Sequence, residues 1–155
     1  MVKLLILDVD GVLTDGTITY DSFGREVKFF NTKDGYGIVR AIKEGLIVSV
    51  VSGRYSWQVE KRCRELGVTE LYQGVSDKEE VYLHLKKKYS LSDSEIAAMG
   101  DDLPDIPILK RVGISGAPAD AVPQVKVIVD FVSRKEGGKG AVREFIDYLL
   151  NREEE

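Results

Sequence analysis

One short stretch near the start of the chain constrains the fold most. Four apolar residues in a row, Leu4–Leu7, end on Asp8-Val-Asp10-Gly11. A continuous apolar run of this length is typical of a strand buried on both faces, as in a parallel sheet covered by helices. The two acids then emerge at the carboxyl end of the strand, where open α/β sheets bind their ligands. Gly11 lets the backbone turn sharply beside them.

The spacing of these two acids indicates a chemistry. A carboxylate can attack phosphorus and form an aspartyl-phosphate when a cation screens the repulsion between it and an anionic substrate. Asp8 is the candidate nucleophile, and Asp10 is the candidate general acid and base. The structural alternative is an ordinary turn, in which Asp and Gly are common. The triplet alone leaves both interpretations open.

Composition excludes several classes of protein. A chain of 155 residues with 43% apolar and 31% charged residues is typical of one globular domain, which we expect to span residues 1–155. The net charge of -4 argues against a nucleic-acid surface. The single cysteine, Cys63, cannot form an internal disulfide, Met1–Leu7 is too short for a signal peptide, and no apolar run is long enough for a bilayer. We therefore expect a cytoplasmic protein with no membrane partner.

The pattern after the first motif predicts a hairpin and then an alternation of strands and helices. The segments 17–21 and 25–30 alternate polar and apolar residues around a turn at 21–24. A lone hairpin is marginal in water, so its apolar residues need either the chain's own sheet or another subunit. These residues are Ile18, Tyr20, Val27 and Phe29.

Further strands are predicted at 46–51, 70–73, 96–99, 112–114 and 125–129, with helices at 36–44, 56–66, from about 77, 103–110 and 141–151. The segment 31–35 is predicted to be a turn, Ser76–Glu79 a capping box, and the last three residues a frayed tail. The alternation predicts a doubly wound, three-layer α/β fold with a parallel sheet.

Two further groups suit a phosphate. Ser52-Gly53-Arg54 follows a predicted strand and offers a hydroxyl, a backbone N–H and a guanidinium. Lys78 lies in the first turn of a predicted helix, where a cation is unfavourable for the helix dipole. The alternatives are a common strand-to-helix turn and an ordinary surface lysine.

A third group suits a metal ion. Asp101, Asp102 and Asp105 follow the predicted strand 96–99, and three carboxylates this close repel one another unless a cation is present. Carboxylate oxygens are the ligands that Mg²⁺ prefers. An acidic helix N-terminus is the alternative.

In this order the motifs resemble the haloacid dehalogenase superfamily, through Asp8-Val-Asp10, Ser52, Lys78 and Gly100–Asp102. The resemblance narrows, over nearly the whole chain, to the 3-deoxy-D-manno-octulosonate 8-phosphate phosphatases. It rests on Asp10–Gly16, Phe30–Gly37, Ser52–Arg54, Leu71–Gly74, Gly100–Asp102 and Gly138–Glu144.

This resemblance implies a magnesium-dependent phosphatase of that sugar acid, in lipopolysaccharide precursor synthesis. It implies Mg²⁺ on Asp8, on the Asp10 carbonyl and on Asp101, with Asp102 and Asp105 as supporting acids. It places Ser52, Gly53 and Lys78 on the phosphate. Further substrate contacts are implied for Asn31, Thr32, Lys33, Asp34, Gly35, Arg54, Arg62 and Lys78. Arg54 or Arg62 is the expected clamp for the substrate carboxylate.

The resemblance also implies a homotetramer, in which the hairpin at about 17–30 stands in place of a cap domain. Four hairpins can close into a β-barrel that buries their apolar residues. The glycine-rich segment 137–140, which carries Lys139, is then expected to reach a neighbour's pocket.

One departure leaves the substrate open. The family commonly has an arginine where Val39 stands, and one residue turns a helical side chain by about 100°, so the neighbouring Arg40 is a poor replacement. A phosphatase of a nine-carbon sugar acid, of the sialic acid type, is the alternative. A phospho-accepting receiver domain is a more remote alternative. A receiver would carry an adjacent acidic pair after the first strand and its acceptor Asp after a central strand, whereas here the first predicted strand carries Asp8-x-Asp10 and a later one carries the pair Asp101-Asp102.

Overall fold

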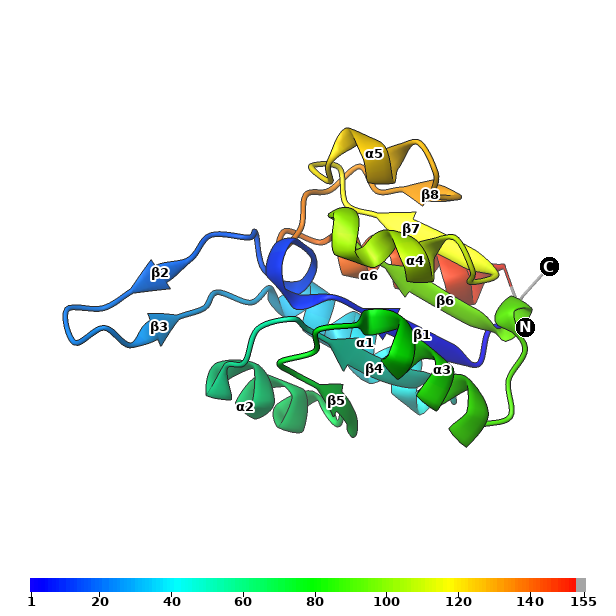
Figure 1. Ribbon diagram of the computed structural model, residues 1–155, viewed down its shortest axis with the longest axis horizontal. Helices are drawn as coiled ribbons and strands as arrows, with labels where there is room; N and C mark the ends of the chain where they lie inside the picture. The colour runs from blue at the N-terminus through cyan, green and yellow to red at the C-terminus, as the bar shows by residue number, and fades with distance from the viewer. Residues whose placement is uncertain (153–155) are drawn as a thin grey trace.

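The computed structural model describes residues 1–152 and shows one parallel sheet with helices on both faces (Figure 1). The six strands lie in the order β5-β4-β1-β6-β7-β8, and every neighbouring pair is parallel. Their bounds are β1 (Leu4–Leu7), β4 (Ile47–Val51), β5 (Glu70–Tyr72), β6 (Ile96–Met99), β7 (Ile114–Ala117) and β8 (Phe131–Val132). Leu4 of β1 lies opposite Ile47 of β4 and Ile96 of β6.

The helices form two layers, as the alternation predicted. α1 (Thr32–Lys43), α2 (Trp57–Leu66) and α6 (Ala141–Asn151) cover one face of the sheet. α3 (Lys78–Lys88), α4 (Ile106–Leu109) and α5 (Pro123–Lys126) cover the other. Leu5 and Leu7 pack against the first layer, and Leu4 and Ile6 against the second. The first strand is therefore buried on both faces, which confirms the doubly wound α/β fold.

Two helices begin differently from the prediction. The segment predicted as a turn at 31–35 is the cap and first turn of α1, because the Asn31 side chain accepts hydrogen bonds from the N–H groups of Lys33 and Asp34. In α3 the cap is Asp77, whose carboxylate accepts a hydrogen bond from the Glu79 N–H, so the predicted capping box at Ser76 is wrong.

The last part of the sheet also differs. The predicted strand at 125–129 is wrong, because α5 begins at Pro123, whose fixed φ suits the first position of a helix. The edge strand is β8 instead. β7 begins at Ile114, later than the predicted 112. Gly116 lets it approach α6, because a Cβ there would lie 2.9 Å from the Phe145 ring.

The predicted hairpin is confirmed, although its paired strands are short. β2 (Thr19–Tyr20) and β3 (Glu26–Val27) pair antiparallel and project from the body of the molecule (Figure 1). Ile18, Tyr20 and Phe29 are 44%, 60% and 71% exposed, so packing on the chain's own sheet is wrong for these three side chains. The predicted tail at 153–155 lies outside the described residues. Within residues 1–152 no helix is long and apolar enough to span a membrane.

Candidate active site

An open cleft of about 370 Å³ lies at the carboxyl ends of β1, β4 and β6. The strand order reverses at β1, which is where sheets of this kind form a ligand crevice. The cleft brings together the predicted catalytic, phosphate-binding and metal-binding side chains, which come from four separate segments of the chain. Its lining is Asp8, Asp10, Gly16, Ser52, Gly53, Arg54, Lys78, Asp101, Asp102, Pro104 and Asp105.

The loop after β1 fixes the two candidate catalytic acids. The Asp8 carboxylate accepts a hydrogen bond from the Val9 N–H at 2.8 Å, and the chain then makes one wide turn over Val9–Leu13. Gly11 has a φ of +85°, and a Cβ there would lie 1.9 Å from Oδ2 of Asp101. Glycine is therefore required both by the backbone and by the close approach of a carboxylate.

Lys78 lies among the acids of the cleft. Its Nζ lies 3.0 Å from Asp8 Oδ1 and 2.6 Å from Asp105 Oδ1. Burial lowers the pKa of the Lys78 ammonium, but the two carboxylates raise it by more, so the group stays charged. This contact explains why a cation stands at the unfavourable end of α3. It also places an ammonium where an anionic substrate would meet Asp8.

The acids of the cleft have the features of a cation site. Asp8, Asp101 and Asp105 each place a carboxylate oxygen within 4.8 Å of the others. Burial and the Asp105 charge raise the pKa of Asp8 to about 6. Burial and the Asp8 charge raise the pKa of Asp101 to about 8. Repulsion of this kind is relieved by a bound cation, so the donor set fits Mg²⁺.

The other two acids hold the loop after β6. Asp105 Oδ2 accepts hydrogen bonds from the N–H groups of Asp101 and Asp102, at 3.0 and 3.3 Å. Asp102 is exposed, and its carboxylate accepts a hydrogen bond from the Leu103 N–H. A Cβ at Gly100 would lie 2.4 Å from the Asp105 Cβ. Both acids therefore make hydrogen bonds within the loop that carries Asp101.

Sequence reasoning missed two residues of the hairpin. Lys28 Nζ lies 2.7 Å from Asp10 Oδ1 and 2.9 Å from Glu26 Oε1, and Arg54 Nη1 lies 2.9 Å from the same Glu26 oxygen. The available signal was their spacing, because residues two apart on a strand point the same way. Nothing in the sequence showed that this side of the hairpin faces Asp10.

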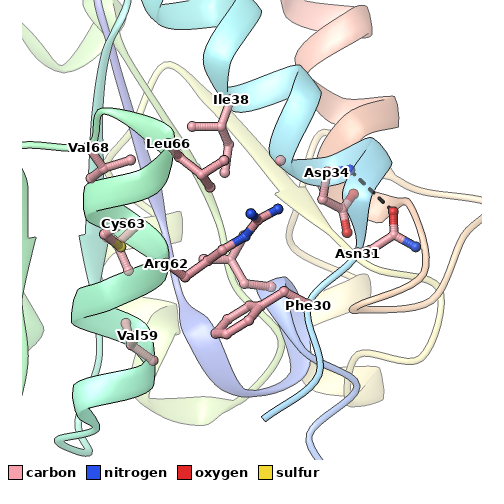
Figure 2. Close-up of a pocket in the computed structure, with 12 residues that line it drawn as sticks. Phe30, Asn31, Asp34, Ile38, Val59, Arg62, Cys63, Leu66 and Val68 are labelled. Carbon is pink, nitrogen blue, oxygen red and sulfur yellow. Dashed lines mark hydrogen bonds between the residues drawn. The ribbon is translucent and has the colours of Figure 1, made fainter.

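Several predicted substrate contacts lie elsewhere. Asn31, Asp34, Gly35 and Arg62 line a second, mostly apolar pocket between α1 and α2, and Figure 2 shows the Arg62 side chain extending into it. A Cβ at Gly35 would lie 2.3 Å from Arg62 Nη2, so glycine makes the space for this guanidinium. The structure does not bring these four residues into the cleft of the same chain.

The remaining predicted contacts, Thr32 and Lys33, are exposed in the first turn of α1. Asp34 is 1% exposed and accepts a hydrogen bond from the Arg143 N–H at 2.9 Å, which ties α1 to α6. Its other oxygen, Oδ2, has no hydrogen-bond partner among residues 1–152.

Two other expectations concern residues beside the cleft. Arg40 pairs with Glu44 and Asp147, at 2.8 and 3.3 Å, so it is held at α1 and α6 and does not take the place of an arginine at Val39. The segment 137–140 is packed on the chain's own catalytic loop: Gly138 N–H donates to the Val12 carbonyl at 2.9 Å. A Cβ at Gly137 would lie 1.9 Å from the Gly11 carbonyl oxygen.

This fold and this arrangement of acids define a class, the haloacid dehalogenase-like hydrolases. The family model described by that name matches residues 67–146, and the chain belongs to the family.

Closer relatives narrow the class. The 3-deoxy-D-manno-octulosonate 8-phosphate phosphatase of Escherichia coli K12 is 47% identical over 149 residues, which cover 96% of this chain and 79% of the relative. The crystal structure of the phosphatase of that name from Yersinia pestis has a TM-score of 0.97 and 42% identity, covering 99% of this chain and 83% of that one. The Moraxella catarrhalis enzyme, solved with magnesium, phosphate and KDO, has a TM-score of 0.94 and 37% identity, covering 97% of this chain and 86% of that one. Within the class, the chain belongs to the family of these phosphatases.

Proposed function

We propose that the chain is a magnesium-dependent phosphatase that hydrolyses 3-deoxy-D-manno-octulosonate 8-phosphate to the free sugar acid and phosphate, supplying a precursor of lipopolysaccharide. The observation that carries this proposal is the position of Asp8, 3.0 Å from Lys78 and within the carboxylate cluster at the end of β1. The identity to phosphatases of this name over most of the chain supports the substrate. It favours this substrate over a nine-carbon sugar acid and over a receiver-type function.

In the first step, an Asp8 carboxylate oxygen attacks phosphorus as the bond between phosphorus and the sugar oxygen breaks. Asp10 gives a proton to the leaving sugar oxygen, and the phosphate is transferred to Asp8. The Ser52 hydroxyl, the Gly53 N–H and the Lys78 ammonium line the cleft where the phosphoryl oxygens lie. In the second step, Asp10 takes a proton from the water that attacks phosphorus, and the bond to Asp8 breaks.

Asp8, the Asp10 carbonyl and Asp101 would hold the magnesium ion. When bound, the ion neutralises the charge shared by these carboxylates and the phosphate. Lys78 holds one oxygen of Asp8 throughout, which aims the carboxylate into the cleft. Asp102 and Asp105 keep the loop that carries Asp101 in place.

We propose Arg54 as the clamp for the substrate carboxylate within the same chain. Its side chain is 40% exposed and lines the cleft, and its guanidinium is held by Glu26. Arg62 and the residues 31–35 line or adjoin a separate pocket, and we propose that they contact the substrate bound in the cleft of a neighbouring chain.

We propose a homotetramer, in the cytoplasm, in which the hairpin replaces a cap domain. The hairpin's exposed apolar side chains support this, since four such hairpins can bury them in a shared barrel. Lys139 is also exposed, although its loop is packed on its own chain. Size-exclusion chromatography with light scattering should give the mass of four chains. A fully active single chain at the assay concentration would contradict the tetramer.

The substrate is tested with a panel of phosphate esters, assayed for released phosphate with and without Mg²⁺. The panel should include 3-deoxy-D-manno-octulosonate 8-phosphate, a nine-carbon sugar-acid phosphate, neutral sugar phosphates and an aryl phosphate. We expect the highest kcat/KM on the eight-carbon acid, and no turnover in EDTA. Equal kcat/KM on the neutral sugar phosphates would contradict recognition of a sugar acid.

A further inference from the structure

The ammonium of Lys28 is buried against the candidate general acid. Its side chain is 2% exposed, and its Nζ makes ion pairs of 2.7 Å with Asp10 Oδ1 and 2.9 Å with Glu26 Oε1. Burial of a lysine is unfavourable unless its charge is paired, so both carboxylates are needed to hold it there. The end of the hairpin at β3 and Lys28 is therefore tied directly to the cleft.

Glu26 is the second half of this connection. The same carboxylate oxygen lies 2.9 Å from Lys28 Nζ and 2.9 Å from Arg54 Nη1. The backbone carbonyl of Glu26 also accepts a hydrogen bond from the Gln58 side chain, which fastens β3 to α2. Lys28 is thus held from two sides and has little freedom to leave Asp10.

The contact leaves one oxygen of Asp10 available for chemistry. Lys28 occupies Oδ1, whereas Oδ2 lies 3.9 Å from the Arg54 guanidinium, and Asp10 and Arg54 both line the cleft. An aspartate has two side-chain torsions, and a fixed ion pair at one oxygen limits both. The rate of proton transfer falls steeply when the donor is misplaced, so the orientation of Asp10 Oδ2 affects the rate of the reaction.

We propose that Lys28 is a positioning residue for Asp10, anchored by Glu26, which aims Asp10 Oδ2 at the oxygen that leaves phosphorus. The inference rests on the proposed phosphatase function and deepens it, because it makes the hairpin part of the proton-transfer machinery. In the step concerned, an Asp8 oxygen forms a bond to phosphorus as the ester bond between phosphorus and the leaving oxygen breaks. The electron pair of the broken bond goes to the leaving oxygen, which takes the proton from Asp10 Oδ2.

This role predicts a dependence on the leaving group. An alkoxide is a poor leaving group and needs the proton, whereas p-nitrophenolate leaves without one. Loss of the ion pair should therefore slow hydrolysis of an alkyl phosphate much more than that of p-nitrophenyl phosphate. A lysine that merely fastens the hairpin would affect both esters alike.

The experiment compares kcat and KM of Lys28→Met, Lys28→Arg and the wild type on β-glycerophosphate and p-nitrophenyl phosphate, with saturating Mg²⁺. Arg25→Met is the matched control. Arg25 follows the hairpin turn, as Lys28 does, but its side chain is exposed and pairs with Asp21. We expect Lys28→Met to lower kcat on the alkyl ester roughly 10- to 100-fold, and on the aryl ester less than about threefold, with KM little changed. Lys28→Arg should restore part of the loss, and Arg25→Met should match the wild type.

Two further variants keep the test decisive if Lys28→Met folds poorly. Glu26→Gln leaves Lys28 in place but removes its anchor, and should give a smaller loss in the same direction. In an Asp10→Asn background, Lys28→Met should cause no additional loss on the alkyl ester, because both changes act through one group.

Equal losses on the two esters, or additive losses in the double variant, would overturn the inference. Wild-type protein that cleaves β-glycerophosphate but not 3-deoxy-D-manno-octulosonate 8-phosphate would overturn the proposed substrate and leave this comparison intact. A wild type that cleaves neither β-glycerophosphate nor 3-deoxy-D-manno-octulosonate 8-phosphate would overturn both the proposed function and the role of Lys28.

Discussion

Replacing Asp101 with asparagine should stabilise the metal-free protein, although it removes a proposed magnesium ligand. Burial and the Asp8 charge raise the pKa of Asp101 from 3.8 to about 8 in the folded chain. At pH 7 the folded state therefore keeps a proton that the unfolded chain has released. A raised carboxyl pKa lowers stability above the unfolded pKa, so the penalty is absent below about pH 4 and grows as the pH rises toward 8.

The size of the effect follows from the same shift. At pH 7, which lies about three units above the ordinary pKa of an aspartate, the raised pKa of Asp101 corresponds to about 4 kcal/mol of lost folding stability. Part of this penalty is shared with Asp8, so the asparagine should recover about 2 to 4 kcal/mol, which raises Tm by roughly 5–15 °C. Magnesium should stabilise the wild type more than the variant. At 100 times its Kd the ion stabilises a protein with an intact site by about 2.7 kcal/mol, and the variant should gain far less.

Urea unfolding in EDTA and in Mg²⁺, at pH 7 and pH 4, measures both effects. Asp77→Asn is the matched control, since Asp77 is exposed, does not line the cleft, and caps α3 through its side chain, which asparagine does as well as aspartate. The control should keep wild-type stability and its response to Mg²⁺. An Asp101→Asn protein that is less stable than the wild type in EDTA at pH 7, or that gains as much from Mg²⁺, would refute the cation site.

Substrate selectivity and acid stability give three further predictions. Arg54→Ala should lower kcat/KM on sugar-acid phosphates roughly tenfold more than on an aryl phosphate, because a bidentate carboxylate contact is lost; steady-state kinetics would show it, and equal losses would count against a clamp. Arg62→Ala should show the same preference, but only in the oligomer, and its effect should disappear in a monomeric hairpin variant. Burial raises the pKa of Glu70, but Lys88 and two tyrosine hydroxyls lower it to about 2 in total. The stability that the charged Glu70 contributes is therefore complete above about pH 4.5 and is lost toward pH 2. Glu70→Gln should lower the free energy of unfolding by about 1 to 3 kcal/mol at pH 7, and thermal melts of the variant and the wild type should converge in acid.

Several residues of the cleft could be predicted from the sequence because they directly follow buried strands. Asp8, Ser52 and Asp101 each stand just after an apolar run, and parallel strands end at the same edge of a sheet. Their proximity therefore follows from topology, without any knowledge of side-chain packing. The boundaries of β6 and of α6 agree with the prediction because a glycine bounds each element, Gly100 after β6 and Gly140 before α6.

The missed features depend on tertiary contacts. Lys28 pairs with Asp10, and Glu26 pairs with Lys28, because of the way the hairpin is oriented against the cleft, which local pattern does not encode. The segment 125–129 is rich in β-branched residues, yet Val125 packs as a helical residue against the second core cluster. Asn31 falls in the predicted turn at 31–35 but caps α1, because an asparagine before a periodic segment can also begin a helix.

The central claim, covalent catalysis by Asp8 on a sugar-acid phosphate, is tested most directly by one comparison. Phosphate release from 3-deoxy-D-manno-octulosonate 8-phosphate is measured for the wild type and Asp8→Asn, at saturating Mg²⁺, after circular dichroism has shown equal folding. An amide is a poor nucleophile, so the variant should lose at least roughly 10³-fold in kcat. An Asp8→Asn protein that keeps about a tenth of wild-type turnover or more would contradict the account.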